Sequence, residues 1–269
     1  MHVSIIITTY NAEKFILSTL NSILAQTYNL YEVIIIDDGS TDKTVDVINQ
    51  FISNHHAEEF KLFLMQRSGR ANALQFGISK AKHDWIAILD ADDLWHERKL
   101  EIQVKYLKHY KIYFLAARCV VFQNENEIDT ARLIDGNINS KLIKSIKLNE
   151  MLRCNKISHI SVLFSKNFAN YNTARKKQID YELWLRLLSQ NVPLYILDIP
   201  LAYHRVHDGQ FFESSNRLIY SASATLLQLH YCIKNYKPLS AVFVITKIFY
   251  YIFVSKKMRL KFANLNLFR

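Results

Sequence analysis

The sequence predicts an α/β protein with a Rossmann-like, mainly parallel sheet flanked by helices, followed by a helical tail. Short apolar, β-branched runs alternate with segments whose apolar residues recur at helical spacing, as in βαβ units. The chain has 269 residues, 50% of them hydrophobic, with only five glycines and three prolines. This composition allows a sizeable core and excludes long low-complexity tracts, so we expect one α/β domain with appendages.

The first 110 residues contain the regular part of this pattern. Strands are predicted at 3–8, 31–36, 60–65 and 85–89, and helices at 12–26, 45–52, 70–82 and 97–110. Asn11 is a plausible N-cap for the first helix. After residue 110 the pattern is less regular, with a strand at 112–122, a polar loop at 124–147 and a helix at 179–189.

Polar and acidic residues follow three of the predicted strands. They are Tyr10-Asn11, Asp37-Asp38 and Asp90-Ala91-Asp92-Asp93. Ligands of open α/β sheets bind outside the carboxyl ends of the strands, so these groups should converge at one edge.

The acidic run 90–93 suggests a cation. A turn such as 37–40 has an ordinary explanation, because Asp, Gly and Ser are common turn residues. Three carboxylates within four residues, however, repel one another unless a cation or hydrogen-bond donors compensate. Carboxylate oxygens suit Mg²⁺ or Mn²⁺, which also bind diphosphates. A nucleotide diphosphate is therefore the expected ligand.

The net charge of +10 is concentrated at the C-terminal end. Residues 214–269 hold nine of the 34 basic residues and no acidic residue, so segment 1–213 is nearly neutral. This placement indicates an anionic partner for the tail alone, and a membrane surface is the natural candidate. No zinc-finger or RRM-like pattern accompanies the charge, so we expect no nucleic-acid partner.

The tail contains two apolar segments. Residues 218–236 have the spacing of an amphipathic helix that Pro238 ends, and 239–254 is apolar but short for a membrane span. With Lys256, Lys257, Arg259 and Lys261 beside it, the second segment is typical of an interfacial helix on anionic lipid. The alternative is a helix packed on the α/β body.

The cellular location is inferred from the N-terminus and the cysteines. The sequence begins with an apolar strand pattern without a basic region or cleavage site, so a secretory signal is not expected. Three cysteines without CxxC spacing indicate neither disulfides nor zinc, which fits a reducing compartment. We therefore expect a cytoplasmic protein attached peripherally to the inner face of the cell membrane.

Four segments in order resemble inverting family 2 glycosyltransferases of the GT-A fold, of the type that builds bacterial surface polysaccharides. They are SIIITTYN (4–11), EVIIIDDGS (32–40), LDADD (89–93) and DYELWLR (180–186). The resemblance spans roughly residues 3–210. It implies a catalytic domain at 1–213, with a nucleotide-sugar half at 1–110 and an acceptor half at 111–213, whereas 214–269 lies outside it.

The resemblance implies roles for residues at the first three strand ends. Thr8 and Tyr10 would line the base pocket, with the Tyr10 ring against a pyrimidine; a buried strand-end tyrosine is the alternative. Asp38 would accept a hydrogen bond from uracil, which favours UDP as the carrier. Asp90 would contact the ribose or the sugar, and Asp92 would hold the Mn²⁺ or Mg²⁺ that stabilises the leaving group.

Two residues of the third helix also correspond to donor-site positions. Arg70 would contact a phosphate or the sugar, with a solvated arginine as the alternative. Gln75 stands where many relatives have Asn, which leaves the identity of the sugar open.

The second half supplies the remaining implied site residues. Asp180 would be the catalytic base, and a helix N-cap is the alternative. Relatives often have Glu where this chain has Ile179. His207 closes an aromatic-Arg-x-His segment and would ligate the ion or contact the diphosphate, with an exposed loop histidine as the alternative.

The expected function is that of an inverting hexosyltransferase, which moves one sugar from a UDP-sugar to a lipid-linked saccharide in O-antigen, lipopolysaccharide or capsule biosynthesis. The alternative acceptors are polyprenyl phosphate and protein. A non-catalytic nucleotide-sugar-binding module is the alternative from another class. A dinucleotide oxidoreductase is excluded, because no glycine fingerprint follows the first strand.

Overall fold

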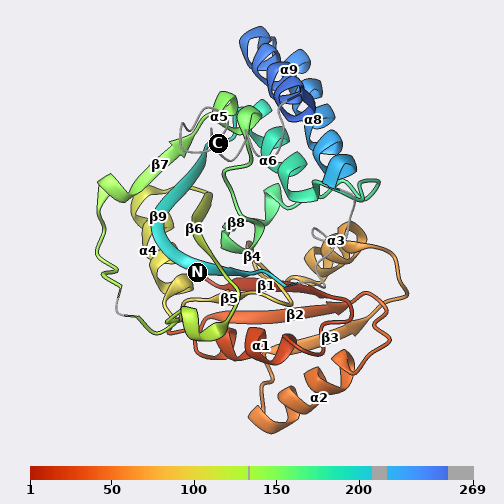
Figure 1. Cartoon of the computed structure of the whole chain (residues 1–269). Helices are drawn as coiled ribbons and strands as arrows, with labels where there is room; N and C mark the ends of the chain where they lie inside the picture. Colours follow the sequence, from red (N-terminus) through yellow and green to blue (C-terminus); the bar gives the residue numbers. More distant parts are fainter. Residues whose placement is uncertain (133, 208–216, 254–269) are drawn as a thin grey trace.

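The computed structural model describes residues 1–132, 134–207 and 217–253 (Figure 1). Within these residues one mixed sheet of nine strands has the order β3-β2-β1-β4-β8-β6-β9-β5, and β7 pairs with β9. Helices cover both faces of the sheet (Figure 1). The α/β class predicted from the alternating pattern is confirmed.

The first half follows the predicted order closely. Its elements are β1 (Val3–Thr9), α1 (Ile16–Leu24), β2 (Tyr31–Asp37), α2 (Thr44–His55), β3 (Phe60–Leu64), α3 (Arg70–Lys80), β4 (Trp85–Asp90), β5 (Leu94–Trp95) and α4 (Lys99–Tyr110). The strands β1 to β4 are parallel to their neighbours in this group. Their carboxyl ends therefore face the same edge of the sheet.

The second half is built mostly from antiparallel pairs and short elements. It contains β6 (Phe114–Phe122), β7 (Ile143–Ile146), α5 (Leu148–Arg153), β8 (Leu163–Ser165), α6 (Ile179–Ser189) and β9 (Leu194–Arg205). Four short 3₁₀ helices lie between them: η1 (Glu125–Glu127), η2 (Ser140–Leu142), η3 (His159–Ser161) and η4 (Lys166–Phe168). β8 runs antiparallel to β4 and β6, so the sheet is parallel mainly in its first half.

Sequence reasoning missed the three-residue strand β8, and it also missed two longer strands of this half, β7 and β9. β7 lies in the segment predicted as a polar loop, and its central residues Lys144 and Ser145 are exposed. β9, to which no strand was assigned, pairs with β5, β6 and β7. Pairing with distant strands stabilises both, and the local sequence does not record it.

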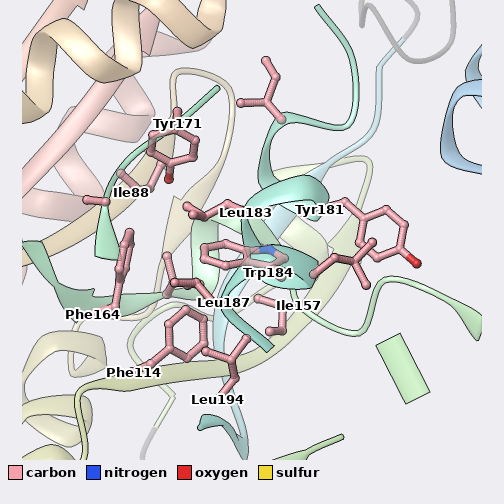
Figure 2. Packing of buried hydrophobic residues seen from close by; sticks show 14 of the residues in the cluster. Ile88, Phe114, Ile157, Phe164, Tyr171, Tyr181, Leu183, Trp184, Leu187 and Leu194 are labelled. Carbon is pink, nitrogen blue, oxygen red and sulfur yellow. The ribbon is translucent and has the colours of Figure 1, made fainter. Parts of the chain in front are cut away.

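Alternate residues of the central strands supply two separate cores. Ile5 and Ile7 of β1 face α1, α2 and α4, whereas Ile6 faces α3, α5 and α6. The second core is centred on Trp184, whose ring lies 5.1 Å from Phe114 and 5.8 Å from Phe164 between ring centroids (Figure 2). Trp184 and Trp95 are fully buried, so both are core residues.

Gly77 allows α3 to approach the sheet closely. A Cβ at this position would lie 2.7 Å from Cγ2 of Ile6 and 3.1 Å from Cγ1 of Ile36, both of which are buried. Because larger residues would push α3 away, the glycine fixes how near the start of this helix lies to the strand ends.

The predicted start of the first helix is wrong. α1 begins at Ile16 with Phe15 as its N-cap, so Asn11 does not cap it. Asn11 has a left-handed backbone, and its side chain accepts a hydrogen bond from Thr41 N at 2.8 Å. Pro238 lies after the end of one helix, as predicted, but it is also the first residue of the next.

The tail forms two helices, α8 (Arg217–Lys234) and α9 (Pro238–Phe253), that pack on the body (Figure 1). Tyr231 Oη donates to Glu182 Oε1 at 3.0 Å, and Val244 of α9 is buried in the Trp184 core. Of the helices in the described ranges, none is long and apolar enough to cross a membrane. The predicted boundary at 213/214 and the basic residues 256–261 lie outside the described residues.

Candidate functional site

The carboxyl ends of β1, β2 and β4 meet at one edge of the sheet. Thr8 is opposite Asp90 in the pairing of β1 with β4, and Thr9 is opposite Asp37 in the pairing of β1 with β2. The sequence predicted that these strand ends lie side by side, and the observed pairing register agrees. Tyr10 directly follows β1 and is 43% exposed, so it is not the buried strand-end tyrosine of the alternative.

The carboxylates of the adjacent residues Asp37 and Asp38 accept hydrogen bonds from different segments of the chain. Asp37 closes its own turn, because its carboxylate accepts hydrogen bonds from Ser40 N at 2.9 Å and Ser40 Oγ at 2.5 Å. Asp38 faces the following strand connection instead. Its carboxylate accepts from Ser68 N at 2.7 Å and Gly69 N at 2.9 Å. Asp38 is thus buried and tied to the connection between β3 and α3, whereas Asp37 is tied to its own turn.

Arg67 lies between Tyr10 and Asp38. Its guanidinium carbon is 3.3 Å from the centroid of the Tyr10 ring, and Nη1 donates to Asp38 Oδ2 at 2.7 Å. A flat group that stacks on Tyr10 and donates to Asp38 therefore already fills the position expected for a base. The Arg67 side chain is 54% exposed, so it can leave this position at small cost.

Arg70 joins two parts of the site that are far apart in the sequence. Its Nη2 donates to Asp90 at 2.5 and 2.8 Å and to Nδ1 of His159 at 2.8 Å. Desolvation lowers the pKa of the guanidinium, but the carboxylates of Asp90 and Asp180 outweigh it and hold the pKa above its ordinary value. Arg70 is therefore a paired cation, and its side chain, which is 40% exposed, also keeps contact with solvent.

His159 is a buried, neutral partner of Arg70. Burial and the adjacent charge of Arg70 lower the pKa of His159 to about 3. Because Nδ1 accepts from Arg70, the proton lies on Nε2, which donates to Tyr171 Oη at 2.7 Å. The backbone N of Tyr171 donates to Gln75 Oε1 at 3.0 Å, so Gln75 binds the protein backbone in this structure.

Asp92 and His207 form the best candidate for a metal site. Nε2 of His207 lies 3.1 Å from Oδ2 of Asp92, and its ring packs against Phe15 at 4.3 Å between centroids. Among the residues that the structure describes, no group of three or more His, Cys, Asp or Glu side chains could hold a metal. One carboxylate and one imidazole still fit an ion that takes its other ligands from a diphosphate and water.

Asp93 stabilises the acidic turn from within. It is fully buried and accepts from Arg205 N at 2.7 Å, while His204 Nδ1 lies 3.1 Å from its carboxylate. Burial raises the pKa of Asp93, and the bond to Asp93 raises the pKa of His204. Arg205 Nε also donates to Asp92 O at 2.7 Å. β9 therefore supplies the donors that compensate part of the acidic run.

Asp180 lies in the first turn of α6. The N-cap of this helix is Gln178, so the N-cap alternative for Asp180 is wrong. Asn155 Nδ2 donates to Asp180 Oδ2 at 3.3 Å, and the charge of Asp180 contributes to the raised pKa of Arg70. Ile179, where relatives often have Glu, is buried in the Trp184 core, so the missing carboxylate is replaced by packing.

Sequence reasoning missed four contributors to this site: Arg67, Asn155, His159 and Tyr171. The last three lie in irregular segments around η3 and α6, where no periodic pattern or acidic cluster marks them. Arg67 lies three residues before Arg70, between a predicted strand and a predicted helix. Only its stacking on Tyr10, which the structure shows, distinguishes it from an ordinary surface arginine.

The neutral state of His159 makes stability depend on pH. A histidine with a lowered folded pKa stabilises the fold above its unfolded pKa of about 6.5, and this contribution is lost as the pH falls towards 3. We expect His159→Gln, which cannot be protonated, to lose less stability between pH 7 and pH 5 than wild type, by up to about 2 kcal/mol. Urea unfolding at both pH values measures the difference.

The exposed His109 provides the control, since His109→Gln should leave the wild-type pH dependence unchanged. An equal loss of stability in His159→Gln and wild type would show that His159 is protonated in the folded protein.

The comparisons with known proteins agree with this geometry. The family model "Glycosyl transferase family 2" matches residues 4–173. The chain is 31% identical over 211 residues to WfaP of Escherichia coli, a UDP-Glc:α-D-GlcNAc-diphosphoundecaprenol β-1,3-glucosyltransferase, covering 77% of this chain and 78% of the relative.

Solved structures with the same fold include two glycosyltransferases. TarS 1–349 of S. aureus in complex with UDP-GlcNAc has a TM-score of 0.69 at 15% identity, covering 98% of this chain and 79% of that one. The mannosyltransferase PcManGT of Pyrobaculum calidifontis, in complex with GDP-Man and Mn²⁺, has a TM-score of 0.60 at 17% identity, covering 100% and 81%.

These likenesses confirm the expected GT-A fold. Because the family model matches more than half of the chain, the assignment does not depend on any single motif. The chain belongs to glycosyl transferase family 2 and is a glycosyltransferase.

Proposed function

We propose that this enzyme inverts the anomeric centre of a UDP-sugar as it transfers one hexose to a hydroxyl of a lipid-linked saccharide, in the biosynthesis of a surface polysaccharide. The name of WfaP, with a UDP-sugar donor and a diphosphoundecaprenol-linked acceptor, supports this choice. Polyprenyl phosphate or protein as acceptor, and a non-catalytic nucleotide-sugar-binding module, are the alternatives that the experiments below separate.

The observation that carries the proposal is the convergence of the donor-site candidates with the candidate base. Asp90 ends β4 and Asp92 lies in the turn after it, Arg70 pairs with Asp90, and the charge of Asp180 acts on Arg70. A donor whose diphosphate lies over the end of β4 would therefore hold its sugar near Asp180.

The base pocket consists of Thr8, Tyr10 and Asp38. The Tyr10 ring offers a face for the pyrimidine, and the Asp38 carboxylate offers an acceptor for the uracil N3–H. Arg67 makes both of these interactions before the donor binds. The uracil must therefore displace the guanidinium of Arg67.

Asp92 and His207 would hold the divalent cation, Mn²⁺ or Mg²⁺. When bound, this ion would stabilise negative charge on the leaving diphosphate. The chain's own residues orient the donor: Asp90 contacts the ribose or sugar, and Arg70 fixes Asp90 while its remaining N–H groups face the diphosphate.

Asp180 is the proposed general base. Its carboxylate takes the proton of the acceptor hydroxyl while that oxygen attacks the anomeric carbon on the face opposite UDP, which inverts the configuration. Asn155 donates to one carboxylate oxygen and leaves the other for the acceptor.

Replacing the base tests catalysis against simple binding. We expect Asp180→Asn to lower kcat by roughly 10²–10⁴-fold because proton removal is lost, with UDP affinity unchanged. UDP release in the presence of acceptor and calorimetric UDP binding measure the two effects. Asp135→Asn, at an exposed loop carboxylate, is the control. Equal turnover of the Asp180→Asn variant and wild type would reject Asp180 as the base.

The contacts of Arg67 predict that its removal increases the affinity of the enzyme for UDP. We expect Arg67→Ala to bind UDP up to about fivefold more tightly, because the half-exposed Arg67, whose ion pair with the buried Asp38 is worth about 1 kcal/mol, no longer competes with uracil. Arg118→Ala is a matched control, since Arg118 is also 54% exposed and pairs with Asp198. Weaker binding of UDP to the Arg67→Ala variant would instead make Arg67 a donor ligand.

Metal dependence is tested through the pair at the end of β4. We expect chelation to weaken UDP binding and to abolish transfer, and Mn²⁺ to restore both in wild type. In Asp92→Asn, Mn²⁺ should restore UDP binding only at concentrations about 10–100-fold higher, because the ion has lost its carboxylate. An Asp92→Asn variant that responds to Mn²⁺ as wild type does would assign the ion to other residues.

We further infer that segment 214–269 attaches the enzyme peripherally to the inner, cytoplasmic face of the cell membrane. The segment holds nine basic residues and no acidic one, which suits an anionic leaflet. The described part of this segment, α8 and α9, packs on the body through one face, so only its outer parts are available to lipid.

A further inference from the structure

The turn between α8 and α9 exposes large apolar side chains. We define the hairpin tip as residues 233–242. Exposed fractions within it are 75% for Ile233, 91% for Tyr236, 86% for Leu239 and 58% for Val242. Isolated exposed apolar residues are common, but four within ten residues around one turn form a patch that suggests a binding surface.

The packing of the hairpin explains which side chains are left outside. Tyr231 and Cys232 of α8 and Ser240 and Val244 of α9 are buried against the body. Asn235 Oδ1 accepts from Ser189 Oγ at 2.8 Å, which ties the turn to the end of α6. The apolar tip is thus presented on a fixed base and points away from the core.

Positive charge accompanies this apolar surface. Lys234 and Lys237 flank Tyr236, and segment 214–269 contains no carboxylate that could neutralise them. A tyrosine between lysines, beside aliphatic side chains, is the combination that partitions into the headgroup region of a bilayer.

A cavity beside the hairpin tip is also lined by both apolar and basic side chains. It has a volume of about 510 Å³ and is lined by Lys147, Leu148, Leu188, Ser189, Asn191, Val192, Pro193, Asn235 and Lys237. Two lysines and several hydrogen-bond donors at the mouth of an open cavity suit a phosphate-bearing headgroup.

A second copy of this chain is a poorer occupant of the patch. A twofold contact would place the same surface on both subunits, so it would bring Lys234 and Lys237 of both copies into one interface. Like charges at such a contact repel, whereas an anionic lipid surface attracts them.

The position of the tip also relates to the catalytic base. Gln228 of α8 bonds to Tyr181 of α6, and Asn235, directly after α8, bonds to Ser189 of α6, so the two helices run in the same direction. The tip therefore lies beside the C-terminal end of α6, and Asp180 lies near its N-terminal end. At 1.5 Å per residue, Asp180 is about 14 Å from Ser189 along the helix axis.

We propose that the hairpin tip inserts into the interface of an anionic membrane and holds Asp180 at a height above the lipid that a diphosphate-linked saccharide can reach. The proposal rests on the proposed function for the identity of the acceptor. It replaces an interfacial α9 lying flat on the membrane with insertion of a turn, because α9 itself packs on the body.

The test is sedimentation of the full chain with vesicles of phosphatidylglycerol and phosphatidylcholine. We expect the triple variant Ile233→Ser, Tyr236→Asn and Leu239→Ser to bind about 10–100-fold more weakly, because three apolar side chains no longer enter the interface. Asn is chosen at 236 because Tyr236 has a φ of 53°, which Asn tolerates.

A charge variant and a matched control complete the design. Lys234→Gln with Lys237→Gln should weaken binding to the same vesicles roughly 10–30-fold, and wild type should bind pure phosphatidylcholine poorly. The control changes Leu24→Ser, Leu30→Ser and Tyr113→Ser, three exposed apolar residues outside the tail, and should bind as wild type does.

Two results would overturn the proposal. One is wild-type vesicle binding by the triple variant; the other is a dimeric wild type that the triple variant dissociates while vesicle binding stays the same. Sugar transfer to a water-soluble acceptor separates this test from that of the proposed function. If the triple variant keeps this transfer but binds vesicles as wild type does, membrane insertion of the hairpin tip is rejected and the proposed function is not. Absence of transfer in wild type rejects the proposed function.

Discussion

The site depends on one cation, the guanidinium of Arg70. It bonds Asp90 at the end of β4 and His159 in η3, and it experiences the charge of Asp180 in α6. These groups come from the two halves of the chain, so the cation fixes the donor edge relative to the candidate base. Its buried partner His159 is neutral, which avoids a second positive charge beside the guanidinium.

The same logic explains how three carboxylates are tolerated within four residues. Asp90 is compensated by Arg70, Asp92 lies against His207, and Asp93 accepts from the backbone of Arg205 and contacts His204. Arg70 comes from α3, whereas His204, Arg205 and His207 come from the end of β9 and the residues directly after it. These contacts offset the mutual repulsion of the three carboxylates.

The helix pair of the tail packs on the body and also exposes a turn of apolar and basic residues. One face of α8 and α9 completes the core around Trp184, and Figure 1 shows the pair standing beside α5 and α6. The turn between them carries the apolar and basic residues that the core does not use. Packing and interfacial binding, which the sequence offered as alternatives, are therefore compatible within one hairpin.

The sequence by itself determined the α/β class, the order of the first elements and the strand-end location of Tyr10, Asp38, Asp90 and Asp92. These follow from local periodicity and from the rule that parallel strands end at one edge. Only the tertiary structure decided that Arg67 covers Tyr10, that His159 orients Arg70, and that β7 and β9 are strands. The reason is physical: these features arise from contacts between residues far apart in the chain, for which local sequence carries no periodic signal.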